Sequence, residues 1–224
     1  MIITCHTYAD LISDLRKISP QAHIAGGAVR DTIIQKPIRD IDIFADTADV
    51  EALAARLRAK HGYVRVGQWT QYNGFSDPAM TCVAKFERPD EEIPVCIIGL
   101  QSGYAKPSRN IARFDFGICM AAFTGELPYV LSRDFINDSD ENTFTLCRAD
   151  NAEQYAYSMV RFERLRADRY QGWRLAIPEQ FKDLGERREF RRRFFNAPDG
   201  SWSERDDYLK GIQVQSVLKP KARA

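Results

Sequence analysis

The sequence has few of the features that mark membrane, secreted or zinc-binding proteins. No apolar run approaches the roughly 20 residues that a membrane-spanning helix needs, so no membrane partner is expected. Residues 1–17 lack a basic region followed by a long apolar run, so we expect no signal peptide. None of the five cysteines lies within four residues of another, which excludes zinc-ribbon spacing. Apolar neighbours such as Val95 and Ile118 predict reduced core thiols and a cytoplasmic protein.

The chain also lacks a strong charge of one sign. It has 32 Lys and Arg against 31 Asp and Glu, a formal net charge of +1. A surface for nucleic acid must therefore come from local clustering. The 224 residues and 44% hydrophobic content suit a globular protein with a real core. A shift in composition predicts a first domain over residues 1–150 and an Arg-rich helical extension over residues 151–224.

Hydrophobic periodicity predicts alternating helices and strands through the first domain. It predicts helices over residues 8–18, 28–35 and 49–61, and strands over residues 23–25, 40–44, 63–67, 80–86 and 95–100. Beyond these, it predicts a helix over residues 111–123 and two strands within residues 129–148, with a polar turn at 137–142. These elements together indicate an α/β protein.

A double glycine stands between the first predicted strand and the second predicted helix. Gly26 and Gly27 allow positive φ angles and let a ligand approach the backbone closely. A helix that follows such a turn offers amide hydrogens to a phosphate, and Arg30 adds a charge in the first helical turn. Taken alone, a double glycine more often serves an ordinary turn.

Two aspartates follow on the next predicted strand. Because alternate residues share a face, Asp40 and Asp42 should point one way while Ile41 and Ile43 point into the core. Their Cα atoms would lie roughly 6.6 Å apart, close enough for both carboxylates to hold Mg²⁺. A solvated strand face is the plain alternative, and the combination with the glycines and Arg30 favours a functional site.

In this order and spacing, residues 26–42 resemble the head motif of the polymerase-β-type nucleotidyltransferases. The stretch GGAVRDTIIQKPIRDID is most similar to the branch with the class II CCA-adding enzymes and poly(A) polymerases, and only Gln35 departs, where a glycine is usual. Residues 113–121, RFDFGICMA, resemble a second family segment, which opens a helix beside the nucleotide. The resemblance implies that Asp40 and Asp42 are catalytic and metal-binding, and that nucleotide contacts come from Gly26, Gly27, Arg30, Arg113 and Asp115.

The resemblance covers roughly residues 20 to 170 and implies a fold and an activity. The fold would be α/β (α+β), a nucleotidyltransferase head with a small mixed sheet flanked by helices and a helical C-terminal extension. The reaction would use Mg²⁺ or Mn²⁺ to move a nucleoside monophosphate from a nucleoside triphosphate, ATP or CTP, to a hydroxyl. An RNA or tRNA 3′ end is the first expected acceptor. A protein or small-molecule acceptor, and a nucleotide- or RNA-binding module with impaired catalysis, are the alternatives.

Two departures from the family pattern leave the activity open. The family holds its metals with a third carboxylate on a neighbouring strand, and residues 93–98 contain none. Candidates elsewhere are Glu91, Glu92, Asp115 and Asp77. The base-selecting Glu-Asp-x-x-Arg motif is also missing before Arg161. An Arg and Phe cluster at residues 187–195 predicts either RNA contact or a helix docked on the head, and the oligomeric state is not predicted.

Overall fold

The computed structural model describes residues 3–69, 77, 79–186, 194–196 and 202–204. The described residues form two compact units. The first contains those up to Arg148 together with Trp173–Ala176, and the second contains Ala149–Gly172 and those from Ile177 onward. The domain boundary at residue 150 stays a prediction, and most of the Arg and Phe cluster at 187–195 lies outside the described residues.

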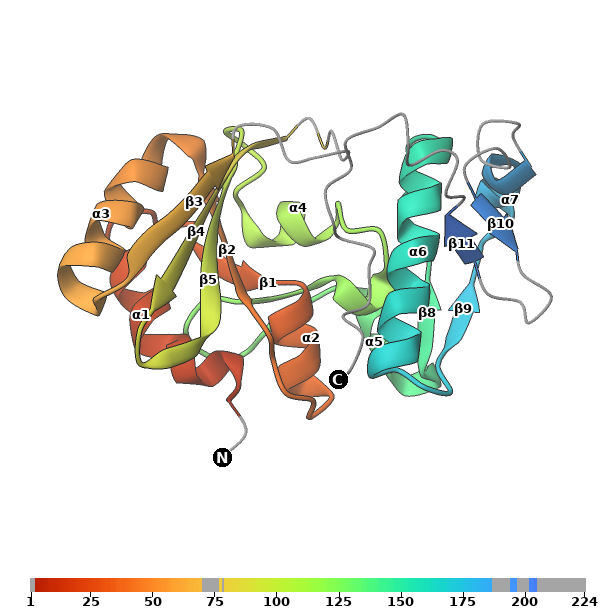
Figure 1. The fold of residues 1–224 in the computed structure, drawn as a ribbon, viewed down its shortest axis with the longest axis horizontal. Helices are drawn as coiled ribbons and strands as arrows, with labels where there is room; N and C mark the ends of the chain where they lie inside the picture. The colour runs from red at the N-terminus through yellow and green to blue at the C-terminus, as the bar shows by residue number, and fades with distance from the viewer. Residues whose placement is uncertain (1–2, 70–76, 78, 187–193, 197–201, 205–224) are drawn as a thin grey trace. The chain divides into compact units, whose positions relative to one another are not determined.

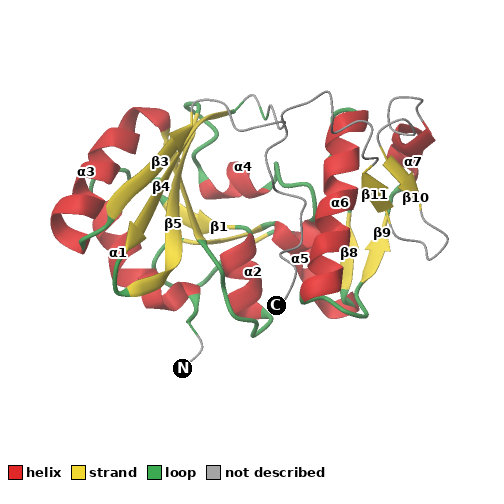
Figure 2. Ribbon diagram, viewed as in Figure 1, coloured by secondary structure: helices red, strands yellow, loops and turns green. Residues whose placement is uncertain are grey.

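Within the described residues, seven strands form one mixed sheet in the first unit, in the order β3-β4-β5-β2-β1-β6-β7 (Figure 1). β2 and β5 pair in parallel, and the other neighbouring strands pair antiparallel. The predicted mixed sheet flanked by helices is confirmed (Figure 2). The strands are β1 (His23–Ala25), β2 (Ile41–Asp46), β3 (Val64–Trp69), β4 (Met80–Arg88), β5 (Glu91–Leu100), β6 (Ala121–Phe123) and β7 (Val130–Leu131).

Helices α1 (Ala9–Leu15), α2 (Gly27–Ile33) and α3 (Val50–His61) confirm three predicted helices, with ends shifted by up to three residues. Short 3-10 helices, η1 (Cys5–Tyr8) and η2 (Thr47–Asp49), precede α1 and α3. Gly62 ends α3 with a φ of +71°, and its amide donates to the Leu57 carbonyl. This left-handed residue closes the helix as a glycine is expected to.

One face of the sheet lies under α3. A Cβ at Gly99 of β5 would meet Val50 of α3, and Ala45 of β2 pairs with Gly99. Because alternate residues share a face, Ile41 and Ile43 point to this side, and both are fully buried. The even-numbered residues of β2, including Asp42, therefore face the opposite side.

The predicted helix over residues 111–123 is wrong. α4 (Pro107–Ile111) ends where that helix was expected to begin, and residues 117–123 form η3 (Gly117–Cys119) and then β6. Backbone groups in this stretch bond to distant partners: the Asp115 carbonyl accepts from the amides of Cys147 and Arg148. Long-range bonds of this kind override a helical spacing of apolar residues.

The two strands predicted within residues 129–148 are also wrong in part. α5 (Arg133–Glu141) fills most of the span, between β7 and β8 (Thr143–Thr145). Ser132 caps α5, because its side chain accepts from the Phe135 amide at 3.0 Å. The expected polar turn contains Asp138, which is buried and accepts from the Ile118 amide at 2.7 Å and from Thr145. A buried, bonded aspartate explains why a polar run is helical here.

The second unit contains α6 (Ala152–Asp168), α7 (Glu179–Glu186) and the strand pair β10 (Phe194–Asn196) and β11 (Trp202–Glu204). Asn151 caps α6 by accepting from the Gln154 amide at 2.9 Å. The extension predicted as helical therefore also holds strands. β9 (Arg174–Ala176) pairs in parallel with β8 in the first unit. In the described part of the chain, every helix is too short or too polar to cross a bilayer.

Candidate functional site

The double glycine forms the sharp turn between β1 and α2. Gly26 has a φ of +74° and its amide donates to the Ala121 carbonyl at 3.0 Å. A Cβ at Gly26 would lie 3.3 Å from the Phe114 ring. A glycine is required here both by the backbone conformation and by the close approach. The turn therefore lies directly against Phe114, in the middle of the second predicted nucleotide segment.

Arg30 is held inside the protein. Its residue is 2% exposed, and its Nε lies 2.8 Å from Asp31 Oδ1. Its Nη1 donates to the Cys119 sulfur at 3.2 Å. These contacts join α2 to the η3 segment. Contact between Arg30 and a phosphate stays a prediction. The guanidinium lies close to the turn, because a Cβ at Gly27 would lie 3.7 Å from Nη2.

The predicted aspartate pair lies at the beginning of β2. Asp40 precedes the strand and is exposed, and Asp42 is half-buried within it. Ile41 and Ile43 are fully buried, as the alternation predicts. The strand begins one residue later than expected, at Ile41. Burial, and then both carboxylates, raise the pKa of the Cys96 thiol. Strand alternation places Asp42 on the face opposite Ile41 and Ile43, whereas Asp40 lies outside the strand, so a shared face for the two aspartates stays a prediction.

Cys96 occupies the position beside Asp42 on the parallel strand β5. The register pairs Asp42 with Cys96, and on the other side β4 pairs Lys85 with Cys96. Residues directly opposite each other in paired strands share a face, so Asp42, Cys96 and Lys85 form a row across three strands. Burial, then Asp42, then Asp40 raise the pKa of the Cys96 thiol to about 12, against a smaller opposing effect of Lys85.

The candidates for a third carboxylate have other partners. Glu91 accepts hydrogen bonds from the hydroxyls of Tyr8 and Tyr63, the latter at 2.5 Å, and lies 3.3 Å from Arg88. Burial, together with the bond to Glu91, raises the pKa of both tyrosines. These contacts make Glu91 a structural acceptor that fastens η1 to the sheet.

Asp77, Asp115 and Glu92 are the remaining candidates. Asp77 forms ion pairs with Arg113 and, at 3.7 Å, with Arg148. Asp115 Oδ1 accepts from the Phe116 amide at 3.0 Å, and Glu92 is exposed. Among the described residues, no three His, Cys, Asp or Glu side chains lie close enough together to share a metal ion. Within this part of the chain, the site has the pair Asp40 and Asp42.

Arg113 belongs to a cluster that the sequence did not reveal. Its guanidinium lies 4.5 Å from the centre of the Tyr104 ring, within cation–π range. Arg148 Nη1 donates to the Arg113 carbonyl at 3.1 Å, and both arginines contact Asp77. Tyr104, Asp77 and Arg148 come from separate loops, so no local spacing connects them.

An aromatic wall connects this segment to β2. The Phe114 ring lies 5.8 Å from the Phe44 ring, and Phe44 stacks on His23 at 5.8 Å. His23 Nδ1 donates to the Gln21 carbonyl at 2.7 Å, so Nε2 accepts from Asn110 Nδ2 at 3.0 Å. Burial lowers the pKa of His23 to about 4 and keeps the ring neutral. His23 is therefore a satisfied core histidine, in line with its lack of ligand-like spacing.

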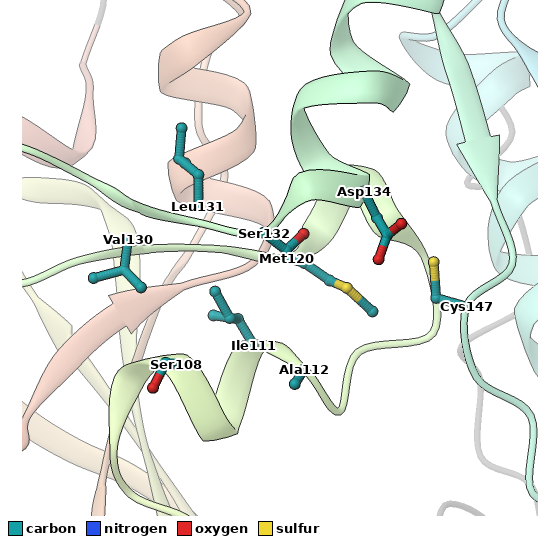
Figure 3. A pocket seen from close by; sticks show the side chains of 9 residues that line it. All are labelled: Ser108, Ile111, Ala112, Met120, Val130, Leu131, Ser132, Asp134 and Cys147. Carbon is teal, nitrogen blue, oxygen red and sulfur yellow. The ribbon is translucent and has the colours of Figure 1, made fainter.

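A separate cavity of about 380 Å³ lies between α4, β7 and α5. Asp134 and Cys147 stand together at one end and Val130 and Leu131 at the other (Figure 3). None of the site residues predicted from the sequence lines this cavity, and Asp115 borders it through its carbonyl, which accepts from the amide of Cys147 at 2.7 Å. The cavity is lined by Ser108, Ile111, Ala112, Met120, Val130, Leu131, Ser132, Asp134 and Cys147.

Comparisons with known proteins support the fold. The model of a protein family described as "Gad2: Gabija anti-defense 2 family protein" matches residues 4–141, more than half of the chain. No curated protein matches the sequence.

Several solved structures are similar at low sequence identity. A tRNA-processing enzyme (apo form I) has a TM-score of 0.55 at 18% identity, over 82% of this chain and 47% of that one. A CCA-adding enzyme with ATP has a TM-score of 0.52 at 16% identity, over 80% and 40%. A tRNA nucleotidyltransferase with a primer tRNA and an ATP analog has a TM-score of 0.50 at 16% identity, over 79% and 48%. The chain thus has a nucleotidyltransferase-like fold and spans less than half of these enzymes.

Proposed function

The chain belongs to the Gabija anti-defense 2 family, and we propose that it acts there as a metal-dependent nucleotidyltransferase. It would move a nucleoside monophosphate from a nucleoside triphosphate to a hydroxyl and release pyrophosphate. One observation carries the proposal. Asp42 lies on β2 beside Cys96, and Asp40 stands immediately before that strand, in a nucleotidyltransferase-like fold whose strand-to-helix turn at Gly26 has a positive φ.

The proposed roles follow from the chemistry of each group. Carboxylate oxygens on Asp40 and Asp42 are the ligands that Mg²⁺ and Mn²⁺ prefer. Such an ion would lower the pKa of the attacking hydroxyl and balance charge on the leaving pyrophosphate. Gly26 and Gly27 let the backbone approach the triphosphate, because no side chain intervenes. Arg113, whose neighbour Phe114 touches Gly26, would contribute a guanidinium that binds phosphate oxygens. Asp115 follows in the same segment and is proposed to contact the nucleotide.

The nucleotide is expected to be ATP or CTP, and the first acceptor is an RNA or tRNA 3′ end. The arginines of the second unit and the likeness to tRNA nucleotidyltransferases support RNA. A protein hydroxyl is the second candidate acceptor. The family description favours it, because a protein that opposes a defence system gains by modifying a component of that system. The missing base-selecting motif points the same way.

Transfer of label from α-labelled ATP and CTP tests the proposal, with RNA and candidate proteins offered as acceptors in Mg²⁺ or Mn²⁺. Asp40→Asn and Asp42→Asn should each lower transfer on the order of 100-fold, since metal-ion stabilisation is worth several kcal/mol. Asp46→Asn is the matched control. It lies on the same strand, and asparagine replaces the aspartate that caps η2 without loss of the cap.

Four outcomes separate the candidates. Label on RNA alone supports the first acceptor, and label on protein alone supports the second. Equal transfer by the parent and Asp42→Asn would show that the site is wrongly assigned. A parent that binds triphosphate tightly but transfers nothing with either metal is a binding module, the interpretation that the missing third carboxylate motivates.

A further inference from the structure

The row Asp42, Cys96 and Lys85 contains a cation that the proposed site has not yet used. Adjacent strands lie about 4.8 Å apart, so the Lys85 Cα lies roughly 10 Å from the Asp42 Cα on the same face. An extended lysine side chain reaches about 6 Å from its Cα. The ammonium of Lys85 can therefore reach a ligand held over Cys96 and Asp42.

The ion pair between Lys85 and Glu87 contributes little to the stability of the fold. Its Nζ lies 2.6 Å from Glu87 Oε1, and the two side chains are 35% and 51% exposed. An exposed ion pair of this kind contributes little to stability. A triphosphate offers a denser negative charge than one carboxylate, so Lys85 can exchange Glu87 for it.

The absence of charge on Cys96 affects which groups can bind the Lys85 ammonium. The register places Cys96 between Asp42 and Lys85, at the position where an acidic residue would complete a three-carboxylate site. An acid there would bind Lys85 across the strands, because opposite charges in paired positions attract. With an uncharged, half-buried thiol in that position, β5 offers no carboxylate at this register position to bind the Lys85 ammonium.

We propose that Lys85 is a phosphate-binding residue of this site, and that Cys96 keeps it available by leaving the central strand uncharged. In a site with three carboxylates, the third acid would help to bind a further metal ion. Here the positive charge would come from the ammonium of Lys85 on β4. The inference rests on the proposed function, since it names a further residue for the same triphosphate.

Binding of a non-hydrolysable triphosphate analog, measured calorimetrically in EDTA, tests Lys85 without any metal. Lys85→Ala should weaken analog binding about 10- to 100-fold, the worth of one charge-assisted hydrogen bond. Binding of the matching nucleoside monophosphate should change less than about 2-fold. Lys85→Arg should restore most of the triphosphate binding, because it restores the charge. Glu87→Gln is the matched control and should leave binding equal or tighter.

Substitutions at Cys96 test the second half of the proposal. Cys96→Asp should weaken metal-free analog binding, because the new carboxylate captures the Lys85 ammonium. Cys96→Ser, which keeps the size and adds no charge, should bind like the parent. Circular dichroism of each variant checks that the fold is retained.

The results distinguish this inference from the proposed function. If the parent transfers label and Lys85→Ala binds the analog as tightly as the parent, only the Lys85 assignment is overturned. Equal binding by Cys96→Asp and Cys96→Ser overturns the role of Cys96. If the parent neither binds triphosphate nor transfers label, both proposals fail together.

Discussion

Two aspartates in the first unit, Asp14 on α1 and Asp42 on β2, have opposite surroundings. Asp14 is 3% exposed, and Arg56 of α3 binds both its oxygens, at 2.7 and 2.8 Å. Lys60 adds a contact at 2.7 Å and His61 one at 3.0 Å. Hydrogen bonds from Arg56, then Lys60, hold the pKa of Asp14 far below its usual range.

Asp42 instead pairs with Cys96 across the sheet, and a second carboxylate, Asp40, stands two residues before it. A carboxylate surrounded by the protein's own cations stabilises the fold and has little left for a ligand. Two neighbouring carboxylates are a common arrangement for binding a cation. The comparison separates an acid whose ion pairs connect α1 to α3 from an acid that lies close to a second acid in the sequence and beside a thiol in the sheet.

Removing the first aspartate should have the largest effect on stability. Asp14→Asn leaves Arg56, Lys60 and Lys17 facing one another around a neutral amide. Loss of one partner of a buried pair costs about 3–5 kcal/mol, and the partly exposed cations can turn to water, so we expect about 2–3 kcal/mol. Urea unfolding at pH 7 measures it. Lys17→Ala, which removes the most exposed of these cations, should change the free energy of unfolding by less than about 0.5 kcal/mol.

Glu91→Gln sharpens the comparison, because Glu91 was a candidate for the third carboxylate. A glutamine at this position would accept only one of the two tyrosine hydroxyl bonds well, and Arg88 would lose its ion pair with this residue and keep the one with Asp90. We expect the free energy of unfolding to fall by about 1–2 kcal/mol. Nucleotidyl transfer, corrected for folded protein, should stay within about 2-fold of the parent. A loss of transfer comparable to that of Asp42→Asn would instead place Glu91 in the site.

The acid dependence of stability should also differ between the parent and Asp14→Asn. The pKa of Asp14 is depressed in the folded protein, so its stabilisation is fully present above the ordinary value of 3.8. It is lost progressively as the pH falls below that value. The difference between the unfolding free energies of the two proteins, measured between pH 7 and pH 2, should therefore be constant above about pH 5 and shrink steadily toward pH 2. A constant difference across this range would contradict the ion cluster.

The sequence predicted local structure well where a single residue determines it. The strand, turn and helix at residues 23–33 depend on Gly26, whose positive φ requires glycine, and the end of α3 depends on Gly62. The failures at residues 111–123 and 129–148 have another cause. Asp115 and Asp138 bond to groups elsewhere in the fold, and no local pattern reveals such partners.

The candidate site divides in the same way. The spacing of Asp40 and Asp42 is local, so the motif and the strand period predicted that both share one side. The positions of Cys96 and Lys85 beside them depend on how β2, β5 and β4 are paired. Strand register follows from the whole sheet, and a shift of one residue would turn the thiol to the other face.

The contact between Gly26 and Phe114 limits which substitutions positions 26 and 114 can accept. A smaller residue at position 114 would open space for a side chain at position 26, yet the φ of +74° would still exclude most of them. A substitution of Gly26 alone is also disfavoured, because any side chain at position 26 would displace the Phe114 ring. Gly26 is thus protected by two independent constraints, and mutational scans should find position 26 intolerant even in a background where position 114 is alanine.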